Sequence, residues 1–442
     1  MFTSTPPWRF LPRLGPLVFS GPFFSEPCSL AVFNHSLGQH VYRRRNCTVN
    51  KLSKHPMRVI MSEKERYDDP RATELRVTKN SSSSPGNNRR EFIHISTLLG
   101  TATVFGEVAE PSKAEARNIV NKKNVRKIAL EEHFNSPSCA QYLKSVDDLF
   151  DPEILANISD LLVEFDEKRI GKMDAAGISI AVLSQTSPGI QQETDSQKAT
   201  LAAKLTNDFL ASNMKRHPER FRGFACIALQ DPKSAVAELE RCINELGFVG
   251  VLVNGHTRGH YLDEPAYDIF WKTLVKLGVP LYLHPTSTFD QPDMFKGAPG
   301  LDGAFWSWTC ETGSHALRLA VSGIFERYPS ARVILGHMGE TLPFQFWRFN
   351  SRSAVRPRNQ QLPKKPSEII KQNFLITTSG VCSDAALLCS LAELGEDSVM
   401  FATDYPYEDV LIAGDWINSA PITDEVRRKV CWDNASRLLK IE

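Results

Sequence analysis

The stretch KIALEEHF, residues 127–134, begins as a short apolar strand and ends in the pair Glu131-x-His133. Three later apolar runs are each followed by another residue that can bind a metal: His284 in PLYLHP, His337 in VILGHMGE and Asp404 in VMFATDYP. Side chains at the carboxyl ends of successive parallel strands in a barrel converge on one face, where the catalytic groups of such barrels lie. Imidazoles and carboxylates gathered there would hold a divalent metal and leave open positions for a substrate.

From residue 125 onward, short apolar runs alternate with segments of helical spacing. The expected strands are residues 127–130, 178–183, 221–228, 248–253, 280–283, 332–335, 374–376 and 399–401. The expected helices are residues 165–176, 197–216, 232–246, 267–277, 315–327, 342–349 and 384–394. Eight strands alternating with helices over about 300 residues predict an α/β fold of the (β/α)8 TIM-barrel type.

A doubly wound open sheet is the alternative fold, because periodicity alone does not close a barrel. The candidate ligands favour the barrel, since they follow the first, fifth, sixth and eighth expected strands. No glycine-rich dinucleotide fingerprint or phosphate-binding loop follows the first strand, so we expect no organic cofactor.

Composition argues against several classes of protein. Residues 1–125 carry 19 Lys and Arg against 10 Asp and Glu, whereas residues 126–442 carry 33 against 41. The acidic catalytic part argues against nucleic acid as a partner, because phosphate binding needs clustered cations. The nine cysteines are scattered and never form CxxC, which is typical of reduced thiols rather than of a disulfide framework. No run reaches the roughly 18 apolar residues that a membrane span requires.

The first 125 residues differ in kind from the rest. They show no sustained amphipathic pattern, and Ser81–Ser84 followed by Pro85-Gly86 has linker composition, so a disordered basic leader is expected. Arg89-Arg90 before a weakly apolar segment resembles a twin-arginine export signal, which favours a periplasmic location. The alternatives are a cytoplasmic protein, an organellar transit peptide over residues 1–60, or a true start at Met57 or Met61.

The chain resembles the amidohydrolase superfamily, of the amidohydrolase-2 type, and most closely its non-oxidative aromatic decarboxylases of the γ-resorcylate and 2,3-dihydroxybenzoate kind. The motifs that carry the resemblance span nearly all of residues 126–442: KIALEEHF, FRGFACIAL, ETGSHALRL, GHMGETLPFQFWR, ITTSG and TDYPYE. Hydrolases of the superfamily usually open with His-x-His on the first strand. This chain has Glu131-x-His133 instead, which is the form of the decarboxylases.

The resemblance implies a role for each candidate residue. Four of them would be metal ligands: Glu131, His133, His284 and Asp404. His337 and Glu340 would form a polar pair beside the metal, and Arg348 would lie near the carboxylate or hydroxyl groups of the substrate. Tyr407 stands where relatives often have a phenylalanine that lines the ring pocket, so its hydroxyl could bond a ring substituent.

Non-oxidative removal of a carboxylate from an aromatic ring begins with protonation of the ring carbon that bears it, because direct loss of CO2 would leave an unstable aryl anion. A divalent cation, Zn²⁺ or Mn²⁺ with Mg²⁺ as a further option, would orient a hydroxybenzoate and stabilise its phenolate. The resemblance assigns the proton delivery to Asp404, tuned or relayed by His337 and Glu340. A metal lowers the pKa of a ligating carboxylate, so His337 is the rival proton donor.

The main alternative function is a metal-dependent hydrolase of a lactone, amide or cyclic ester, in which Asp404 would act as a base toward water. A catalytically silent barrel used for binding is a third hypothesis. His256 and His260 in NGHTRGH are expected to be solvated loop residues rather than ligands. Family resemblance further implies a homodimer or homotetramer, with the HALRL and FWRF helices as contact surfaces.

Overall fold

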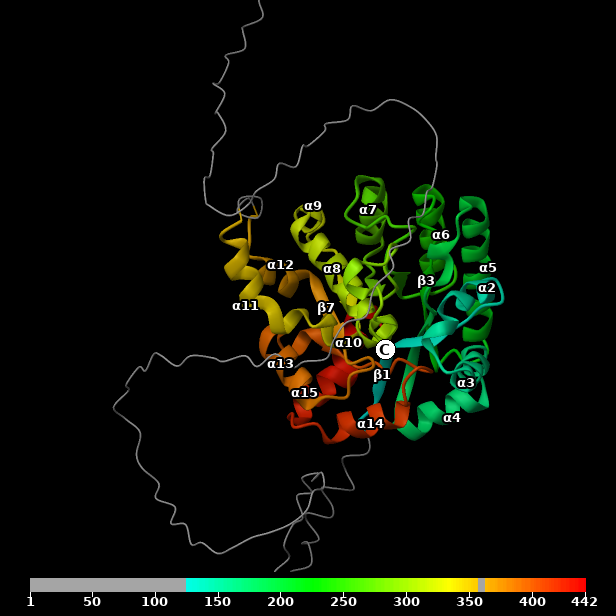
Figure 1. Cartoon of the computed structure of the whole chain (residues 1–442). Helices are drawn as coiled ribbons and strands as arrows, with labels where there is room; N and C mark the ends of the chain where they lie inside the picture. The colour runs from blue at the N-terminus through cyan, green and yellow to red at the C-terminus, as the bar shows by residue number, and fades with distance from the viewer. Residues whose placement is uncertain (1–124, 357–361) are drawn as a thin grey trace, which may run out of the picture. The chain divides into compact units, whose positions relative to one another are not determined.

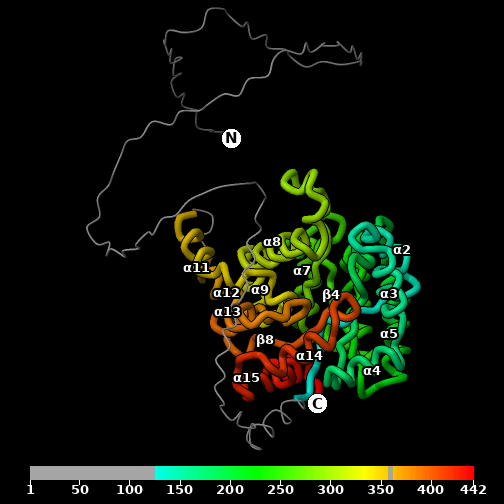
Figure 2. Tube along the Cα trace, turned by 60° about the horizontal axis from the view of Figure 1, so that its bottom comes forward, coloured from blue at the N-terminus to red at the C-terminus, as the bar shows by residue number. Residues whose placement is uncertain are grey.

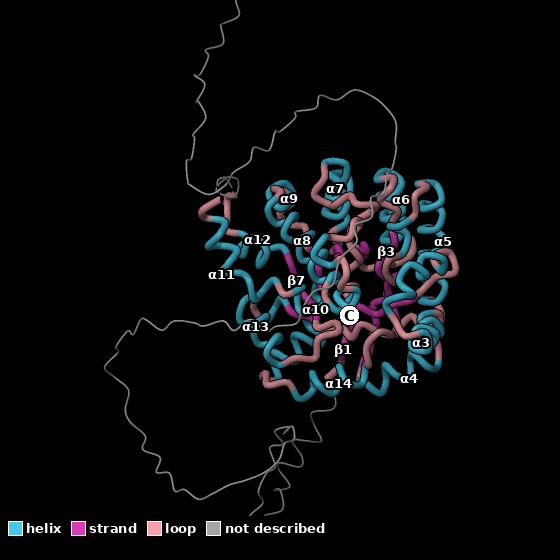
Figure 3. The backbone as a smooth tube through the Cα atoms, in the orientation of Figure 1, coloured by secondary structure: helices cyan, strands magenta, loops and turns pink. Residues whose placement is uncertain are grey.

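The computed structural model describes residues 125–356 and 362–442, so the predicted leader with Arg89-Arg90 lies outside the described residues. Eight parallel strands pair in the order of the chain, from β1 to β8. The strands are β1 Lys127–Phe134, β2 Ile178–Gln185, β3 Phe221–Cys226, β4 Gly250–Asn254, β5 Leu281–His284, β6 Val333–Leu335, β7 Phe374–Thr377 and β8 Val399–Met400. They stand at the centre of a ring of helices (Figures 1 and 3).

The segment after β8 returns to β1 and closes the barrel. Leu130 N donates to Phe401 O at 3.2 Å, and His133 N donates to Tyr405 O at 2.7 Å. Glu132 and Tyr405 form an isolated parallel bridge. The sheet therefore has no long open edge, and the predicted (β/α)8 barrel is confirmed over the open-sheet alternative.

Helices follow the strands, and most of them cover the outside of the barrel, whereas the short segment α10 His337–Glu340 lies at its mouth. They are α2 Ala140–Leu143, α3 Pro152–Leu162, α4 Glu167–Ala176, α5 Ser196–Met214, α6 Pro232–Asn244, α7 Asp268–Leu277, α8 Ser307–Val321, α9 Ile324–Arg327, α10 His337–Glu340, α11 Leu342–Ser353, α12 Pro366–Asn373, α13 Asp384–Leu394, α14 Val410–Ser419, α15 Asp424–Arg428 and α16 Asn434–Leu439. The late helix α14 packs beside the early helix α4, which completes the ring (Figures 1 and 2). Among the described residues, no helix has the length and apolar character to cross a membrane.

One expected helix was wrong. Residues 315–327 were expected to form a single helix, but α8 begins at Ser307 and ends at Val321, and α9 starts at Ile324. Gly323 between them has φ +80°, a left-handed conformation that stops an α-helix and suits glycine.

Two apolar clusters make up the core: one fills the interior of the barrel and the other lies between the strands and the helices. Successive residues of a strand belong to these two clusters in turn. Ile128 and Leu130 on β1 face the interior, together with Tyr282 and Ile334, whereas Ala129 faces the helices. Between Ala129 and Glu132 the pairing of β1 with β2 contains one extra residue on β1. Before this bulge the even-numbered residues of β1 face the interior of the barrel, and after it the odd-numbered residues do.

Candidate active site

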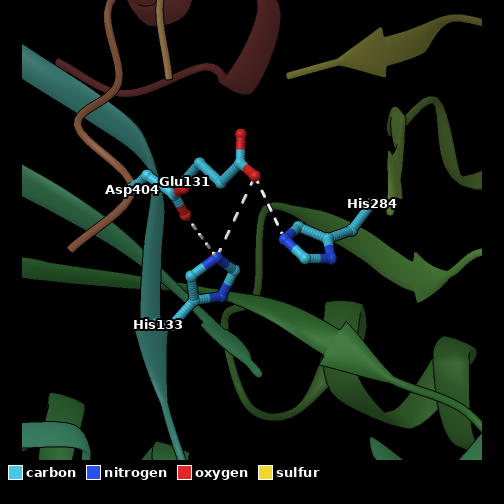
Figure 4. A group of neighbouring side chains, drawn as sticks. All are labelled: Glu131, His133, His284 and Asp404. Atoms are coloured by element: carbon cyan, nitrogen blue, oxygen red, sulfur yellow. Dashed lines mark ion pairs between the residues drawn. The ribbon is translucent and has the colours of Figure 1, made fainter. Parts of the chain in front are cut away.

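Four polar side chains meet at the carboxyl-terminal mouth of the barrel (Figure 4). One ligand atom each from Glu131, His133, His284 and Asp404 lies within 4.8 Å of all the others. His284 Nε2 is 3.1 Å from Glu131 Oε1, and His133 Nε2 is 3.2 Å from Asp404 Oδ1. The sequence placed these residues far apart along the chain, and the fold brings all four together.

Each of the four side chains is aimed by its local backbone. Glu131 and His133 face the interior because of the bulge in β1, and His284 is the last residue of β5. Asp404 follows β8 and has φ +70°, a left-handed conformation that is uncommon for a residue other than glycine. Its backbone N donates to the backbone O of Glu131 at 3.0 Å, which joins the backbone segments that carry the two carboxylates.

The hydrogen bonds around the four residues leave their inner atoms free. Tyr282 O–H donates to Glu131 Oε2 and lies 2.8 Å from Thr377 Oγ1. His284 Nδ1 donates to the carbonyl oxygen of Pro285 at 2.9 Å, so Nε2 is the ring nitrogen that points to Glu131 Oε1. Glu131 Oε1 and His133 Nε2 are buried, and among the described residues their close contacts with His284 Nε2 and Asp404 Oδ1 lack hydrogen-bond geometry.

Orphaned buried polar atoms are costly unless something pairs with them, and here they converge on one point. Two imidazoles and two carboxylates without a thiolate are donors that suit a divalent ion such as Zn²⁺ or Mn²⁺. Space for Glu131 is provided by Gly336, where an added Cβ would lie 2.5 Å from Glu131 Oε2. The residues present therefore fit a single divalent metal.

His337 and Glu340 form a pair beside this cluster. His337 Nδ1 lies 2.7 Å from Glu340 Oε1, and Thr309 Oγ1 donates to Glu340 Oε2 at 2.6 Å. The opposite ring nitrogen, His337 Nε2, is 3.6 Å from Asp404 Oδ2 and 3.7 Å from Glu131 Oε1. His337 thus connects Glu340 to the centre of the site.

The backbone of this pair is left-handed. His337, Met338, Gly339, Glu340 and Thr341 all have positive φ, between 48° and 77°. Such backbone persists only where the surroundings fix it, and it gathers at functional sites. This strained turn, which leads into α11, directs both side chains toward the barrel mouth.

Mutual charges shift the protonation of the site. Burial raises the pKa of Glu131, but His337 and His284 outweigh burial and lower it to about 2. For Asp404, the nearby imidazoles of His133 and His337 likewise outweigh burial and hold the pKa below its usual range. Burial lowers the pKa of His337, yet the carboxylates of Glu131 and Glu340 hold it well above its usual range.

A cavity of about 710 Å³ opens beside the four residues. At its inner end the lining is polar: His284, His337, Glu340, Asp404 and Tyr407. Most of the remaining lining is apolar, with Phe150, Pro285, Trp308, Val381 and Ala386 among its members. An apolar cavity with polar groups converging at one end is the usual form of a small-molecule site.

Tyr407 lies in this cavity as predicted, and Arg348 does not. The Tyr407 hydroxyl is 2.5 Å from Thr186 Oγ1, and its ring stacks on Phe150 with 5.8 Å between centroids. Arg348 is exposed on α11 and is not part of the cavity lining. Within one chain, the Arg348 side chain therefore lies outside the cavity that Tyr407 lines.

The two loop histidines after β4 are outside the site. His260 is exposed and pairs with Glu264 at 2.9 Å, in line with its expected solvated position. His256 was expected to be solvated but is buried, because it lies 3.0 Å from Ser287 O and accepts a hydrogen bond from Gly259 N. Both imidazole rings make contacts that stabilise the loop after β4 and its surroundings.

Sequence reasoning missed Tyr282. Its hydroxyl holds one oxygen of Glu131 and leaves the other free for a metal. The available signal was its position two residues before His284 on one strand, which places both side chains on the same face of the sheet.

A barrel of eight parallel strands with imidazole and carboxylate groups at its carboxyl-terminal mouth defines a class of (β/α)8 enzyme that works with a bound metal. Within this class, the family profile described as amidohydrolase matches residues 157–441, and the chain belongs to this family.

This chain aligns with nearly the whole length of several known proteins. γ-Resorcylate decarboxylase of Polaromonas sp. is 39% identical over 325 residues, which are 71% of this chain and 98% of the relative. A crystal structure of 2,6-dihydroxybenzoate decarboxylase with 2,6-dihydroxybenzoate is 39% identical, with a TM-score of 0.68 over 71% of this chain and 99% of the other. A dihydroxybenzoic acid decarboxylase from Polaromonas sp., with manganese and the inhibitor 2-nitroresorcinol, is 39% identical, with a TM-score of 0.67 over 71% and 97%. The predicted family resemblance is confirmed.

Proposed function

We propose that this chain is a metal-dependent, non-oxidative decarboxylase of a hydroxybenzoate-type aromatic acid. The observation that carries the proposal is the cluster of Glu131, His133, His284 and Asp404 at the inner end of a largely apolar cavity. The similarity to γ-resorcylate and dihydroxybenzoate decarboxylases supports the reaction, and it does not favour the hydrolase alternative.

The four clustered residues are the proposed ligands of one divalent ion. A similar decarboxylase structure contains manganese, which supports Mn²⁺ ahead of Zn²⁺, with Mg²⁺ as the third option. When bound, the ion would act as a Lewis acid that stabilises a phenolate and orients the substrate. The reaction converts the aromatic carboxylate and one proton into the arene and CO2, so it requires no organic cofactor.

Delivery of that proton is the task proposed for Asp404, His337 and Glu340. Asp404 and His337 both line the cavity, and a small closure of the 3.6 Å between Asp404 Oδ2 and His337 Nε2 would bring the two atoms to the roughly 2.6–3.2 Å at which a proton transfers. Glu340 holds Nδ1 of the same ring and thereby fixes its orientation. The chain thus supplies Asp404 as the proton donor at the cavity wall and His337 as a group that can reprotonate it.

The apolar wall of the cavity would hold the ring, and Tyr407 would contact one of its substituents. Tyr407 is already bonded to Thr186, so a ring hydroxyl there would join an existing pair. Arg348 lies one helical turn from Phe344, which does line the cavity. Its proposed contact with the substrate carboxylate would therefore have to be made across an interface between copies.

Self-association as a homodimer or homotetramer is the proposed assembly. Four large aromatic side chains are exposed. Just before α8, Phe305 is 77% and Trp306 is 44% exposed, and on α11, Phe344 is 79% and Trp347 is 77% exposed. Exposed aromatic patches of this kind mark interaction surfaces. Sedimentation velocity of the purified protein tests the assembly, and a monomer at micromolar concentration would contradict it.

A direct assay tests the proposed reaction. Protein loaded with Mn²⁺ or Zn²⁺ is incubated with 2,6-dihydroxybenzoate, 2,3-dihydroxybenzoate or salicylate, and the phenol and CO2 are measured. We expect turnover of at least one acid, lost on chelation and restored by added metal. Hydrolysis of a lactone panel without decarboxylation of any acid would overturn the proposal in favour of the hydrolase.

A further inference from the structure

Glu132 stands between the two proposed ligands of β1, but its side chain lies on the other face of the strand. It is buried, and together with Arg169, Lys172 and Met173 of α4 it lines a small gap outside the barrel. Glu132 Oε1 accepts a hydrogen bond from Thr403 N at 3.0 Å, and Oε2 lies 2.7 Å from Thr403 Oγ1. One carboxyl group therefore accepts from both the backbone N–H and the hydroxyl of the residue that precedes Asp404.

The segment that carries Asp404 is bonded to β1 on either side of Thr403, through Phe401 O and Asp404 N, and Glu132 provides the hydrogen bonds of Thr403 itself. Strand β8 is two residues long and ends at Met400, so the residues that carry Asp404 lie beyond its pairing with β7. Arg169 strengthens the neighbouring contact, because it donates to His133 O at 2.8 Å and its guanidinium lies 4.5 Å from the centre of the Tyr405 ring. Buried polar groups thus join the end of β1 to the segment after β8 from outside the barrel.

Asp404 needs such support because its φ of +70° is unfavourable for a residue with a side chain. A released Thr403 would let this backbone relax and move the Asp404 carboxylate away from His133. We propose that Glu132 is a positioning residue that holds Asp404 in its strained conformation and so completes the metal site. The inference rests on the proposed ligand role of Asp404.

Three variants separate positioning from simple stability. Glu132→Ala leaves both groups of Thr403 without their acceptor. Glu132→Gln preserves the grip, because its carbonyl oxygen can accept from Thr403 N and its amide can donate to Thr403 Oγ1. Thr403→Val removes the hydroxyl contact and keeps the backbone one.

Asn434→Ala is the matched control. Asn434 is fully buried and donates to Glu396 O at 2.7 Å and to Val399 O at 2.9 Å, so it anchors the start of β8. Its loss should destabilise the same strand from the end that is remote from Asp404.

The measurement is the Mn²⁺ dissociation constant of the full-length apoprotein, from the electron paramagnetic resonance signal of free Mn²⁺, beside its melting temperature. We expect Glu132→Ala to weaken Mn²⁺ binding about 10- to 100-fold, the range for partners that orient metal ligands. Thr403→Val should weaken it less, and Glu132→Gln should bind nearly as the unmodified protein does. Asn434→Ala should melt at a lower temperature with its Mn²⁺ affinity unchanged.

Several outcomes would overturn the inference. It is wrong if Glu132→Ala binds Mn²⁺ as tightly as the unmodified protein, or if Asn434→Ala loses as much affinity at an equal drop in melting temperature. If Glu132→Ala does not fold, unchanged affinity in Thr403→Val overturns it instead. An unmodified protein that binds no divalent metal would refute the proposed metal site itself, and the role of Glu132 with it.

Discussion

The interior of the barrel changes character along the strands. Its amino-terminal end is apolar and fully packed, with Ile128, Leu130, Val182, Leu252 and Ile334 buried among one another. Its carboxyl-terminal mouth holds acids and imidazoles, two of them with orphaned atoms, on backbone that is partly left-handed. Both ends share the same strands, and on β1 a single peptide bond separates Leu130 from Glu131. Stability and chemistry are therefore divided by depth in the barrel rather than by segment of the chain.

The largest effect is expected at the mouth. Asp404→Asn retains the shape of the side chain but removes its charge and its capacity to deliver a proton. We expect turnover of the accepted hydroxybenzoate to fall at least about 100-fold, the lower end for acid–base catalysis. Initial rates with metal present measure the loss of turnover, and circular dichroism shows whether the variant is folded. Near-normal turnover in a folded variant would remove Asp404 from its proposed role.

The opposite result is expected at the apolar end. Ile334→Ala empties part of the packed interior, and such substitutions lower the free energy of unfolding by about 2–5 kcal/mol. Turnover per folded molecule should stay close to that of the unmodified protein, because Ile334 does not line the cavity. Urea unfolding measures the free energy of unfolding, and the rate divided by the folded fraction measures the turnover per folded molecule. A large loss of turnover without loss of stability would contradict the division by depth.

A third prediction concerns a buried acid near the mouth. Burial raises the pKa of Glu311 on α8 to about 8. Between its ordinary pKa and about 8, the folded protein holds a proton that the unfolded chain has released, so the free energy of unfolding falls as pH rises through this window. Glu311→Gln cannot ionise and should lose less stability between pH 5 and pH 8. Melting temperatures of both proteins at the two pH values test this, and equal changes would contradict it.

The smallest effect is expected at Tyr407. Tyr407→Phe removes the hydroxyl that meets Thr186 and keeps the ring against Phe150. A neutral hydrogen bond contributes about 0.5–1.5 kcal/mol, so kcat/KM should fall by no more than about tenfold. A comparison of hydroxybenzoates that differ in one ring hydroxyl would locate the contact. An equal change for all of them would indicate that Tyr407 only shapes the wall.

The sequence was sufficient for the barrel and for the gathering of the four proposed ligands. Apolar runs at regular intervals, four of them followed by a candidate ligand such as His284, predict parallel strands with a common mouth. Helix bounds were less predictable, since the break at Gly323 depends on a backbone conformation that apolar spacing does not report.

Contacts between distant residues were the least predictable part of the site. Tyr282 reaches Glu131 across 151 residues and Glu132 reaches Thr403 across 271, and no local pattern encodes such pairs. Arg348 illustrates the reverse case, in which a motif residue is placed correctly on its helix but on a face that the cavity does not include. The roles of all these residues stay predictions until the variants are measured.

The bulge in β1 has a consequence for tolerance of insertions and deletions. The extra residue between Ala129 and Glu132 sets which of the following side chains face the interior. Straightening this bulge at constant strand length would exchange the two faces, turning Glu131 and His133 toward the helices and Glu132 toward the cavity, whereas deletion of the one extra residue would keep the faces of Glu132 and His133. Substitutions that leave the strand length unchanged could thereby dismantle the mouth of the barrel, so libraries built on this scaffold should vary loops and keep residues 129–132 unchanged.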